Sequence, residues 1–160
     1  MGDAASLQVG LILPGVKTPG EGLGCVDFDS AFRRTVEPGP ADIDQLGHVN
    51  NVVYLRWVQD IATTHWFTVA PQDMVESEVW VALKHVIEYR DPILPGETAE
   101  IRTWLGEVRG PRFDRHVDIR KPGAKRFSAR ATTEWCRIAA DTRRPMRIGR
   151  DVLDVFQVPG

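Results

Sequence analysis

The segment Asp42-Ile-Asp-Gln-Leu-Gly-His-Val-Asn-Asn51 carries the side chains whose types and spacing could do chemistry. It places Asp44 and His48 just before an apolar run that begins at Val52. The first turn of a helix has unpaired backbone N–H groups and about half a positive charge, so it can stabilise an oxyanion. A carboxylate beside such donors supplies a base or nucleophile. Together they are what acyl transfer to water requires.

The same polar side chains also have an ordinary structural use. Asp42, Asp44 and Asn50 are residue types that cap loops and helix ends, and from the residues alone this interpretation is the favoured one. A metal site built from Asp42, Asp44 and His48 is disfavoured, because three mixed ligands on one loop follow no recognised spacing. The chemistry therefore depends on the elements that position this segment.

An unbroken helix should follow the polar segment. Residues 52–70 contain neither Gly nor Pro and are apolar on most sides, which predicts about four buried turns with Asn50 or Asn51 as the N-cap. A short strand at 27–36 precedes the segment and ends at Glu37-Pro-Gly-Pro40. Alternating or apolar runs between Pro/Gly turns predict four more strands, at 80–89, 98–107, 113–121 and 126–138. The order predicts an α+β fold, a curved antiparallel sheet wrapped around one helix.

Length and composition fit one globular domain. The 160 residues are 42% apolar and 26% charged, and the formal net charge of −2 gives no sign of a nucleic-acid binder. Two cysteines and no Cys/His cluster predict a reducing, cytoplasmic location without disulfides. No signal peptide or membrane-spanning run is predicted. Six of the 14 glycines fall in residues 1–24, which we expect to form a flexible arm before a single domain at 25–160.

Several of these residues also carry a family resemblance. Gly47-His-Val-Asn-Asn51, followed by Tyr54 and Trp57, resembles the motif of the hotdog-fold acyl thioesterases, which include the 4-hydroxybenzoyl-CoA thioesterase and plant acyl-ACP thioesterase groups. Val86-Ile-Glu-Tyr-Arg-Asp-Pro92 with Gly96-Glu97 resembles the strand that follows the helix in that family. The resemblance covers about residues 26–158. It implies the hotdog fold, in which a curved antiparallel sheet wraps around a long central helix.

The resemblance implies hydrolysis of an acyl-CoA or acyl-ACP thioester to a free acid and a thiol, with no metal or redox cofactor. Asp44 would act as nucleophile or general base, with His48 and Asn50 completing the catalytic set. Backbone N–H groups near Val49 and Asn50 would polarise the thioester carbonyl. Asn51 and Tyr54 would complete the oxyanion and substrate-binding site.

Departures from the pattern leave some roles open. The plant group has D-x-N-x-H, but Leu46 stands where its asparagine would be. Three roles therefore stay open for His48, namely activating water, orienting substrate and bonding the loop backbone. Hotdog hydratases and dehydratases have the longer D-x-N-P-x-H pattern and are a second candidate class. A non-catalytic acyl-CoA-binding protein is a third, and the acid at position 44 argues against it.

Residues outside the segment are weaker candidates. Arg109, Arg112 and Lys121 flank turns where a CoA phosphate could bind, although solvated side chains are the default there. His85 and Cys136 are expected in the core or at an interface. Because one helix and one sheet leave an uncovered edge, we expect a homodimer or a dimer of dimers, and the resemblance places the active sites between subunits. Acyl preference and carrier are not predicted.

Overall fold

The computed structural model describes residues 26–160, so the arm predicted at residues 1–24 lies outside the described residues. The described chain contains five strands and several helices. In chain order they are β1 (Phe32–Val36), η1 (Pro40–Asp42), α2 (Asn51–Val69), α3 (Gln72–Ser77), β2 (Glu78–Tyr89), β3 (Ala99–Arg109), β4 (Arg112–Arg120), β5 (Ala129–Ala139) and α4 (Arg150–Val155). The predicted order of one strand, a long helix and four strands is confirmed.

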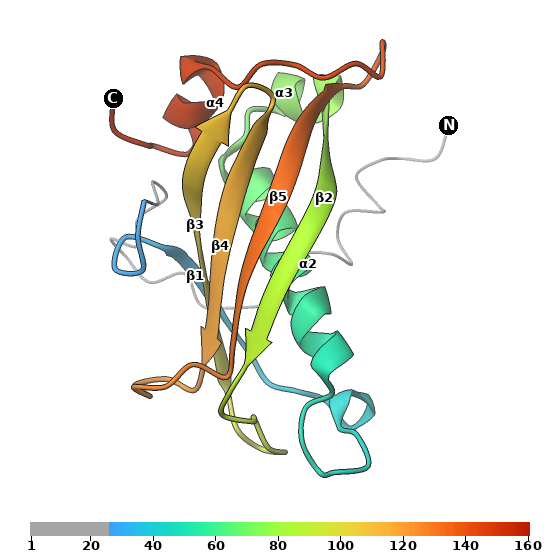
Figure 1. Ribbon diagram of the computed structural model, residues 1–160, viewed down its shortest axis with the longest axis vertical. Helices are drawn as coiled ribbons and strands as arrows, with labels where there is room; N and C mark the ends of the chain where they lie inside the picture. Colours follow the sequence, from blue (N-terminus) through green and yellow to red (C-terminus); the bar gives the residue numbers. More distant parts are fainter. Residues whose placement is uncertain (1–25) are drawn as a thin grey trace.

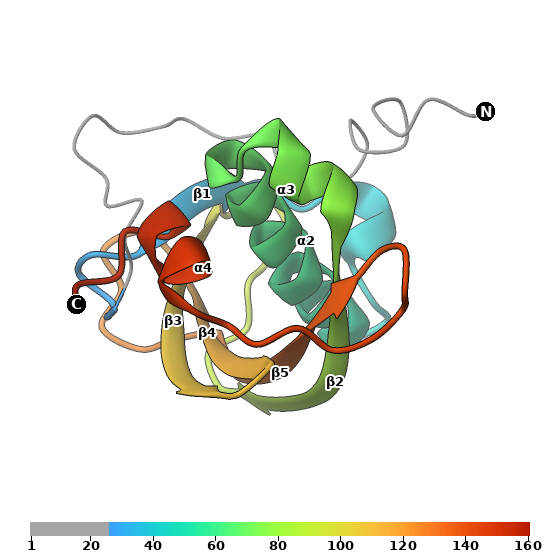
Figure 2. The ribbon, with the colours of Figure 1, turned by 90° about the horizontal axis from the view of Figure 1, so that it is seen from above.

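The five strands form one antiparallel sheet in the order β1-β3-β4-β5-β2. The sheet curls around α2, which lies along its concave side (Figures 1 and 2). This is the predicted α+β hotdog arrangement. β1 and β2 are the two edge strands.

Two apolar clusters hold α2 against the sheet. Near the start of the helix, Val53, Trp57 and Ile61 are buried against β3 and β4; near its end, Trp66 packs in a second cluster with Phe156. Burying one large apolar side chain stabilises the fold by about 1.5–3 kcal/mol, so these contacts fix the position of the helix. The beginning of α2 is thereby held at a defined place relative to the sheet.

The two ends of the sheet carry different features (Figure 1). The loop that leads into α2, the β4–β5 turn and residues 90–97 lie at one end, which we call the loop end. At the other end lie α3, α4 and the β3–β4 turn, and we call this the helix end. The polar segment singled out in the sequence therefore lies at the loop end.

A buried ion pair fastens the C-terminal segment to the sheet at the helix end. Arg137 of β5 donates to both oxygens of Glu78 on β2, and the Nε–Oε2 distance is 3.0 Å. The two side chains are only 5% and 3% exposed. Arg137 also donates to Asp151 of α4 at 2.8 Å and to the carbonyl oxygen of Arg147 at 2.8 Å. This arginine therefore joins β2, β5 and α4.

Candidate active site

The loop before α2 is closed by its own backbone. The N–H of Asp44 donates to the carbonyl oxygen of His48 at 2.8 Å, and the N–H of Gly47 donates to the carbonyl oxygen of Asp44 at 3.1 Å. Gly47 has a φ of +80°, a left-handed conformation that glycine adopts without the steric strain of a side chain. The glycine thus allows the tight turn that brings residues 44 and 48 back together.

Only one oxygen of the Asp44 carboxylate is hydrogen-bonded within this turn. Its Oδ1 accepts the N–H of Leu46 at 2.9 Å and lies 3.5 Å from the N–H of His48. Its Oδ2 accepts no hydrogen bond from the described residues. One oxygen therefore holds the carboxylate in place while the other is available to a water or a substrate.

Asp44 and Asn50 line one open hollow of about 530 Å³. Ile43, Gln45 and Leu46 complete its lining. Leu46 is 76% exposed, so an apolar side chain lies uncovered at the rim of the hollow. His48 is half-buried and is not among the lining residues. The structure therefore brings together two of the three predicted catalytic residues in the hollow and leaves the third outside its lining.

The backbone donors at the start of α2 differ from those expected. The N–H of Val49 donates to the carbonyl oxygen of Ile93 at 2.9 Å, and that of Asn50 donates to the carbonyl oxygen of Asp42 at 2.8 Å. The Asn50 side chain is the N-cap and accepts the N–H of Val52 at 3.1 Å. Within the described chain the N–H of Asn51 has no acceptor. The first-turn donor that remains for an oxyanion is thus that of Asn51.

Asp42 has the structural role that the sequence allowed for it. Its Oδ1 accepts from Arg56 at 2.8 Å and its Oδ2 accepts the N–H of Gly39 at 2.8 Å. Burial acts to raise the pKa of the Asp42 carboxyl, but the bonds from Arg56 and Gly39 outweigh it and hold the pKa below its usual value. Both carboxylate oxygens are occupied, which leaves Asp44 as the candidate base of the segment.

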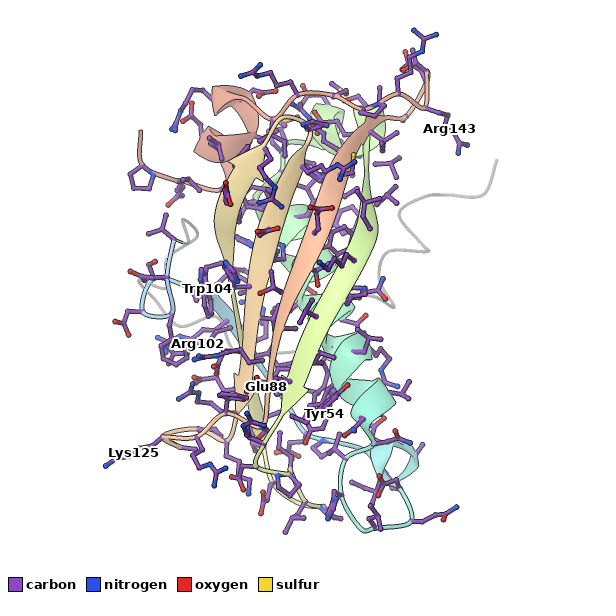
Figure 3. The ribbon with its side chains drawn as sticks, in the orientation of Figure 1. Tyr54, Glu88, Arg102, Trp104, Lys125 and Arg143 are labelled. Carbon is purple, nitrogen blue, oxygen red and sulfur yellow. The ribbon has the colours of Figure 1, made fainter. Side chains whose placement is uncertain are left out.

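Tyr54 contacts the protein backbone rather than an open site. Its hydroxyl oxygen accepts the buried N–H of Ile93 at 3.0 Å, and burial raises the pKa of the phenol. Figure 3 shows Tyr54 at the loop end, where β2 ends beside the beginning of α2. Because the carbonyl oxygen of Ile93 accepts the N–H of Val49, Tyr54 positions Ile93, and Ile93 in turn holds the loop before α2. Its predicted role in substrate binding stays a prediction.

We expect Tyr54→Phe to lower the free energy of unfolding by about 1–3 kcal/mol, because it leaves the buried N–H of Ile93 without an acceptor. Chemical denaturation measures this loss. Tyr89→Phe is the matched control, since the Tyr89 hydroxyl donates to the exposed carbonyl oxygen of Asn51 at 3.2 Å and water can replace it. An equal loss in both variants would contradict the assignment.

A sequence model described as the Thioesterase-like superfamily matches residues 38–156, which is most of the chain. The chain belongs to this superfamily. The match spans the Asp44 loop, α2 and all strands except β1. A search of the curated proteins finds no match.

Three solved structures similar to this chain are a thioesterase, a probable thioesterase and a complex with CoA. Slr0204, a 1,4-dihydroxy-2-naphthoyl-CoA thioesterase from Synechocystis, has a TM-score of 0.67 at 16% identity, over 79% of this chain and 95% of that one. YbaW, a probable thioesterase from Escherichia coli, has a TM-score of 0.68 at 19% identity, over 79% and 98%. SAV2348 from Staphylococcus aureus, in complex with CoA, has a TM-score of 0.70 at 12% identity, over 81% and 87%. At these identities the likeness shows the fold alone.

The three predicted phosphate-binding cations do not form one site in this superfamily member. Arg109 and Arg112 flank the β3–β4 turn at the helix end, whereas Lys121 lies at the loop end. Arg109 donates to Asp114 at 2.7 Å, and Arg109 and Arg112 both donate to Glu134. Lys121 lies 2.8 Å from Glu97 and 3.6 Å from Asp91. Each is already paired with carboxylates, and only Lys121 shares an end with Asp44.

The remaining candidates lie apart from the loop. His85 Nδ1 lies 2.8 Å from the hydroxyl of Thr133, and burial lowers the pKa of its imidazole. Cys136 is buried. Asp60, which the sequence pattern did not single out, lies half-buried on α2, and burial raises the pKa of its carboxyl despite the charge of Arg56. Only the folded helix reveals that environment, since a single acid within a helix has no distinguishing spacing in the sequence.

Neither a metal centre nor a membrane-spanning helix is found in residues 26–160. No three His, Cys, Asp or Glu side chains gather there as metal ligands would. None of the described helices has both the length and the apolar character needed to cross a bilayer.

Proposed function

We propose that the chain hydrolyses an acyl-CoA or acyl-ACP thioester, with Asp44 as general base or nucleophile. The observation that carries the proposal is the free Oδ2 of Asp44 in a hollow shared with Asn50, the N-cap of α2. Membership of the Thioesterase-like superfamily supports the reaction class. No metal or redox cofactor enters the proposed chemistry.

In the proposed reaction the thioester carbonyl oxygen faces the N–H of Asn51 and the positive end of the α2 dipole. Asp44 Oδ2 takes a proton from a water as that water attacks the carbonyl carbon, or attacks the carbon itself to form an anhydride that water then opens. The negative charge on the carbonyl oxygen is stabilised by the helix N-terminus, where one such donor contributes about 2.7–4 kcal/mol in comparable sites. Breakage of the C–S bond releases the sulfur as a thiolate, which takes the proton held by Asp44 or one from water to become the thiol, and the acyl group leaves as the carboxylic acid.

The carrier proposed first is CoA, because one structure of the same fold is in complex with CoA and another is described as acting on an aromatic acyl-CoA. ACP stays an alternative carrier. We propose a cytoplasmic location because the sequence has only two cysteines, too few for a disulfide framework.

A thiol-release assay on the purified protein tests the function directly. Short, long and aromatic acyl-CoAs should be compared, and at least one should give turnover that follows protein concentration. Binding without turnover would favour the non-catalytic acyl-CoA-binding alternative. Water addition to an enoyl-CoA without thiol release would favour the hydratase alternative.

We also propose that two copies of the chain pair through the edge strand β2. The outward side chains of this strand include Val79, Val81 and Val86, each at least 42% exposed. An edge strand with free backbone groups and exposed apolar side chains is a template for pairing with another strand. A twofold axis at this edge would continue the sheet into a second protomer. A dimer of dimers would add a further interface.

We expect light scattering to give at least twice the 17.9 kDa of one chain at micromolar concentration. Val81→Glu should shift the population toward the monomer, because it places a charge on the outward, apolar face of the paired edge. Glu107→Gln, at an exposed position of β3, is a control that should leave the dimer intact. A wild-type monomer with full activity would contradict the proposed pairing.

A further inference from the structure

A cavity of about 350 Å³ lies within a single chain at the helix end, away from the Asp44 loop (Figure 1). Its walls come from the second half of α2, the beginning of β2, α3, β4, β5 and the residue after α4. The volume is within the range of about 300–1,000 Å³ found for small-molecule sites. Half of the twelve lining residues are aromatic, namely Trp66, Phe67, Trp80, Phe113, Trp135 and Phe156.

The aromatic rings around the cavity pack edge to face. The ring centroid of Trp80 lies 5.6 Å from that of Trp66 at an interplanar angle of 73°, and 5.1 Å from that of Phe113 at 86°. A flat aromatic ligand can continue this packing, because aromatic pairs prefer such geometry. A flexible alkyl chain has no such preference and loses more conformational freedom when it binds. The lining therefore favours a rigid aromatic ligand.

Two polar groups from the beginning of β2 lie among these rings. Glu78 and Trp80 are two residues apart on one strand, so their side chains share a face of the sheet, and both line the cavity. Each oxygen of the Glu78 carboxylate accepts one hydrogen bond from Arg137. A carboxylate has about four acceptor positions, so Glu78 can accept further bonds. The indole N–H of Trp80 is buried and has no acceptor within residues 26–160.

A neutral hydroxyl group matches these two polar groups. It can donate its hydrogen to Glu78 and accept the N–H of Trp80 with the same oxygen. An ionised carboxylate could only accept, and it would add a negative charge beside Glu78 in a buried site. Arg115, the other charged residue of the lining, already donates to Thr103 at 3.1 Å and contacts His65 Nδ1 at 3.0 Å. The polar groups therefore favour an alcohol over an acid.

We propose that this cavity is a second ligand site, which binds a small phenol. The ring of the phenol packs against Trp66, Trp80 and Phe113, and its hydroxyl bonds to Glu78 and Trp80. The site uses neither the Asp44 loop nor a second chain. The inference therefore goes beyond the proposed function and does not rest on it.

Isothermal titration calorimetry of the full chain tests the site with three probes of similar shape, namely p-cresol, p-xylene and p-toluate. We expect p-cresol to bind with one site per chain. p-Xylene, which has a methyl group in place of the hydroxyl, should bind roughly tenfold more weakly or worse, since a hydrogen bond to a charged group contributes about that factor to Kd. p-Toluate, the anion, should also bind more weakly than p-cresol. Equal binding of p-cresol and p-xylene, tighter binding of p-toluate, or no saturable binding of p-cresol would each overturn the proposal.

Two matched substitutions test the contact with the hydroxyl. Trp80→Phe keeps an aromatic ring in the wall but removes the N–H, so it should weaken p-cresol binding several-fold and leave p-xylene binding little changed. Trp104→Phe is the control, because Trp104 lies on β3, packs against His116 and does not line the cavity. An equal loss of p-cresol affinity in both variants, or no loss in Trp80→Phe, would contradict the proposal.

A cavity-filling variant shows where the phenol binds. Ala62→Leu enlarges a buried side chain of α2 that lines the cavity and should abolish p-cresol binding; Val75→Phe, on α3, replaces it if its melting curve shows that it does not fold. Asp44→Asn should leave p-cresol binding unchanged. Binding that persists in the filled variant, or that is lost in Asp44→Asn, would place the phenol elsewhere and overturn the proposal. Because these measurements need no turnover, failure of the thiol-release assay and failure of this site are seen separately.

Discussion

Replacing Asp44 with Asn should lower kcat by about 10²–10⁴-fold while KM changes far less. The amide keeps an oxygen that can accept the N–H of Leu46, so the turn should survive. What it loses is the ability of Oδ2 to take a proton or attack a carbonyl, and such a group contributes to kcat more than to binding. Steady-state kinetics on the best acyl-CoA, with a melting curve to confirm folding, measures the effect. Near-normal turnover would refute the role of Asp44.

Two further variants show whether this loss is specific. Asp42→Asn is the matched control, because Asp42 has the same chemistry two residues away but binds Arg56 and Gly39 with its carboxylate. It should reduce stability slightly and leave kcat within a few fold. His48→Ala should reduce kcat less than Asp44→Asn does, since His48 lies outside the hollow. A larger loss in His48→Ala than in Asp44→Asn would reverse the ranking of their roles.

The fold was predictable where the sequence has a clear period. The prediction failed where a local side chain competes with the backbone for hydrogen bonds. The unbroken apolar run predicted a helix over 52–70, within one residue of α2 at each end. The first strand was predicted from residue 27 but begins at Phe32. Asp27 instead accepts the N–H of Ser30 at 2.8 Å, a side-chain turn that replaces strand pairing. α3 was missed because six residues are too few to show a helical period.

The candidate site was predictable in its residues but not in its hydrogen bonds. The helix N-terminus next to an acid can be read from the spacing of Asp44 and Asn50. The hydrogen bond from Val49 to Ile93 cannot be read from the sequence. Its acceptor lies in another loop more than forty residues away, and only the closed fold brings the two residues together. The same reason explains why Arg109 and Lys121 looked equivalent in the sequence. Their carboxylate partners, and the opposite ends they occupy, follow from strand pairing.

Removal of the Arg137 side chain should cause the largest loss of stability of any single ion-pair change here. Arg137→Ala would leave the Glu78 carboxylate buried without its partner, which typically destabilises a protein by about 3–5 kcal/mol. For a domain of this size each kcal/mol lowers the melting temperature by about 2–4 °C. Arg150→Ala is the control, because Arg150 and Asp154 form an exposed pair that should contribute about 1 kcal/mol or less.

A second pair of measurements identifies the buried charge as the cause of that loss. The double variant Glu78→Leu/Arg137→Met removes both charges and should recover most of the stability, because an apolar pair of similar volume avoids the desolvation of two ions. The Arg137 hydrogen bond also lowers the pKa of Asp151 below its usual 3.8. This interaction stabilises the fold at pH values above 3.8, and the stabilisation is lost as the pH falls through the lowered pKa of Asp151. In Arg137→Ala the free energy of unfolding should therefore fall less steeply with decreasing pH in the acid range. A double variant as unstable as Arg137→Ala would instead assign the loss to packing of α4 against the sheet.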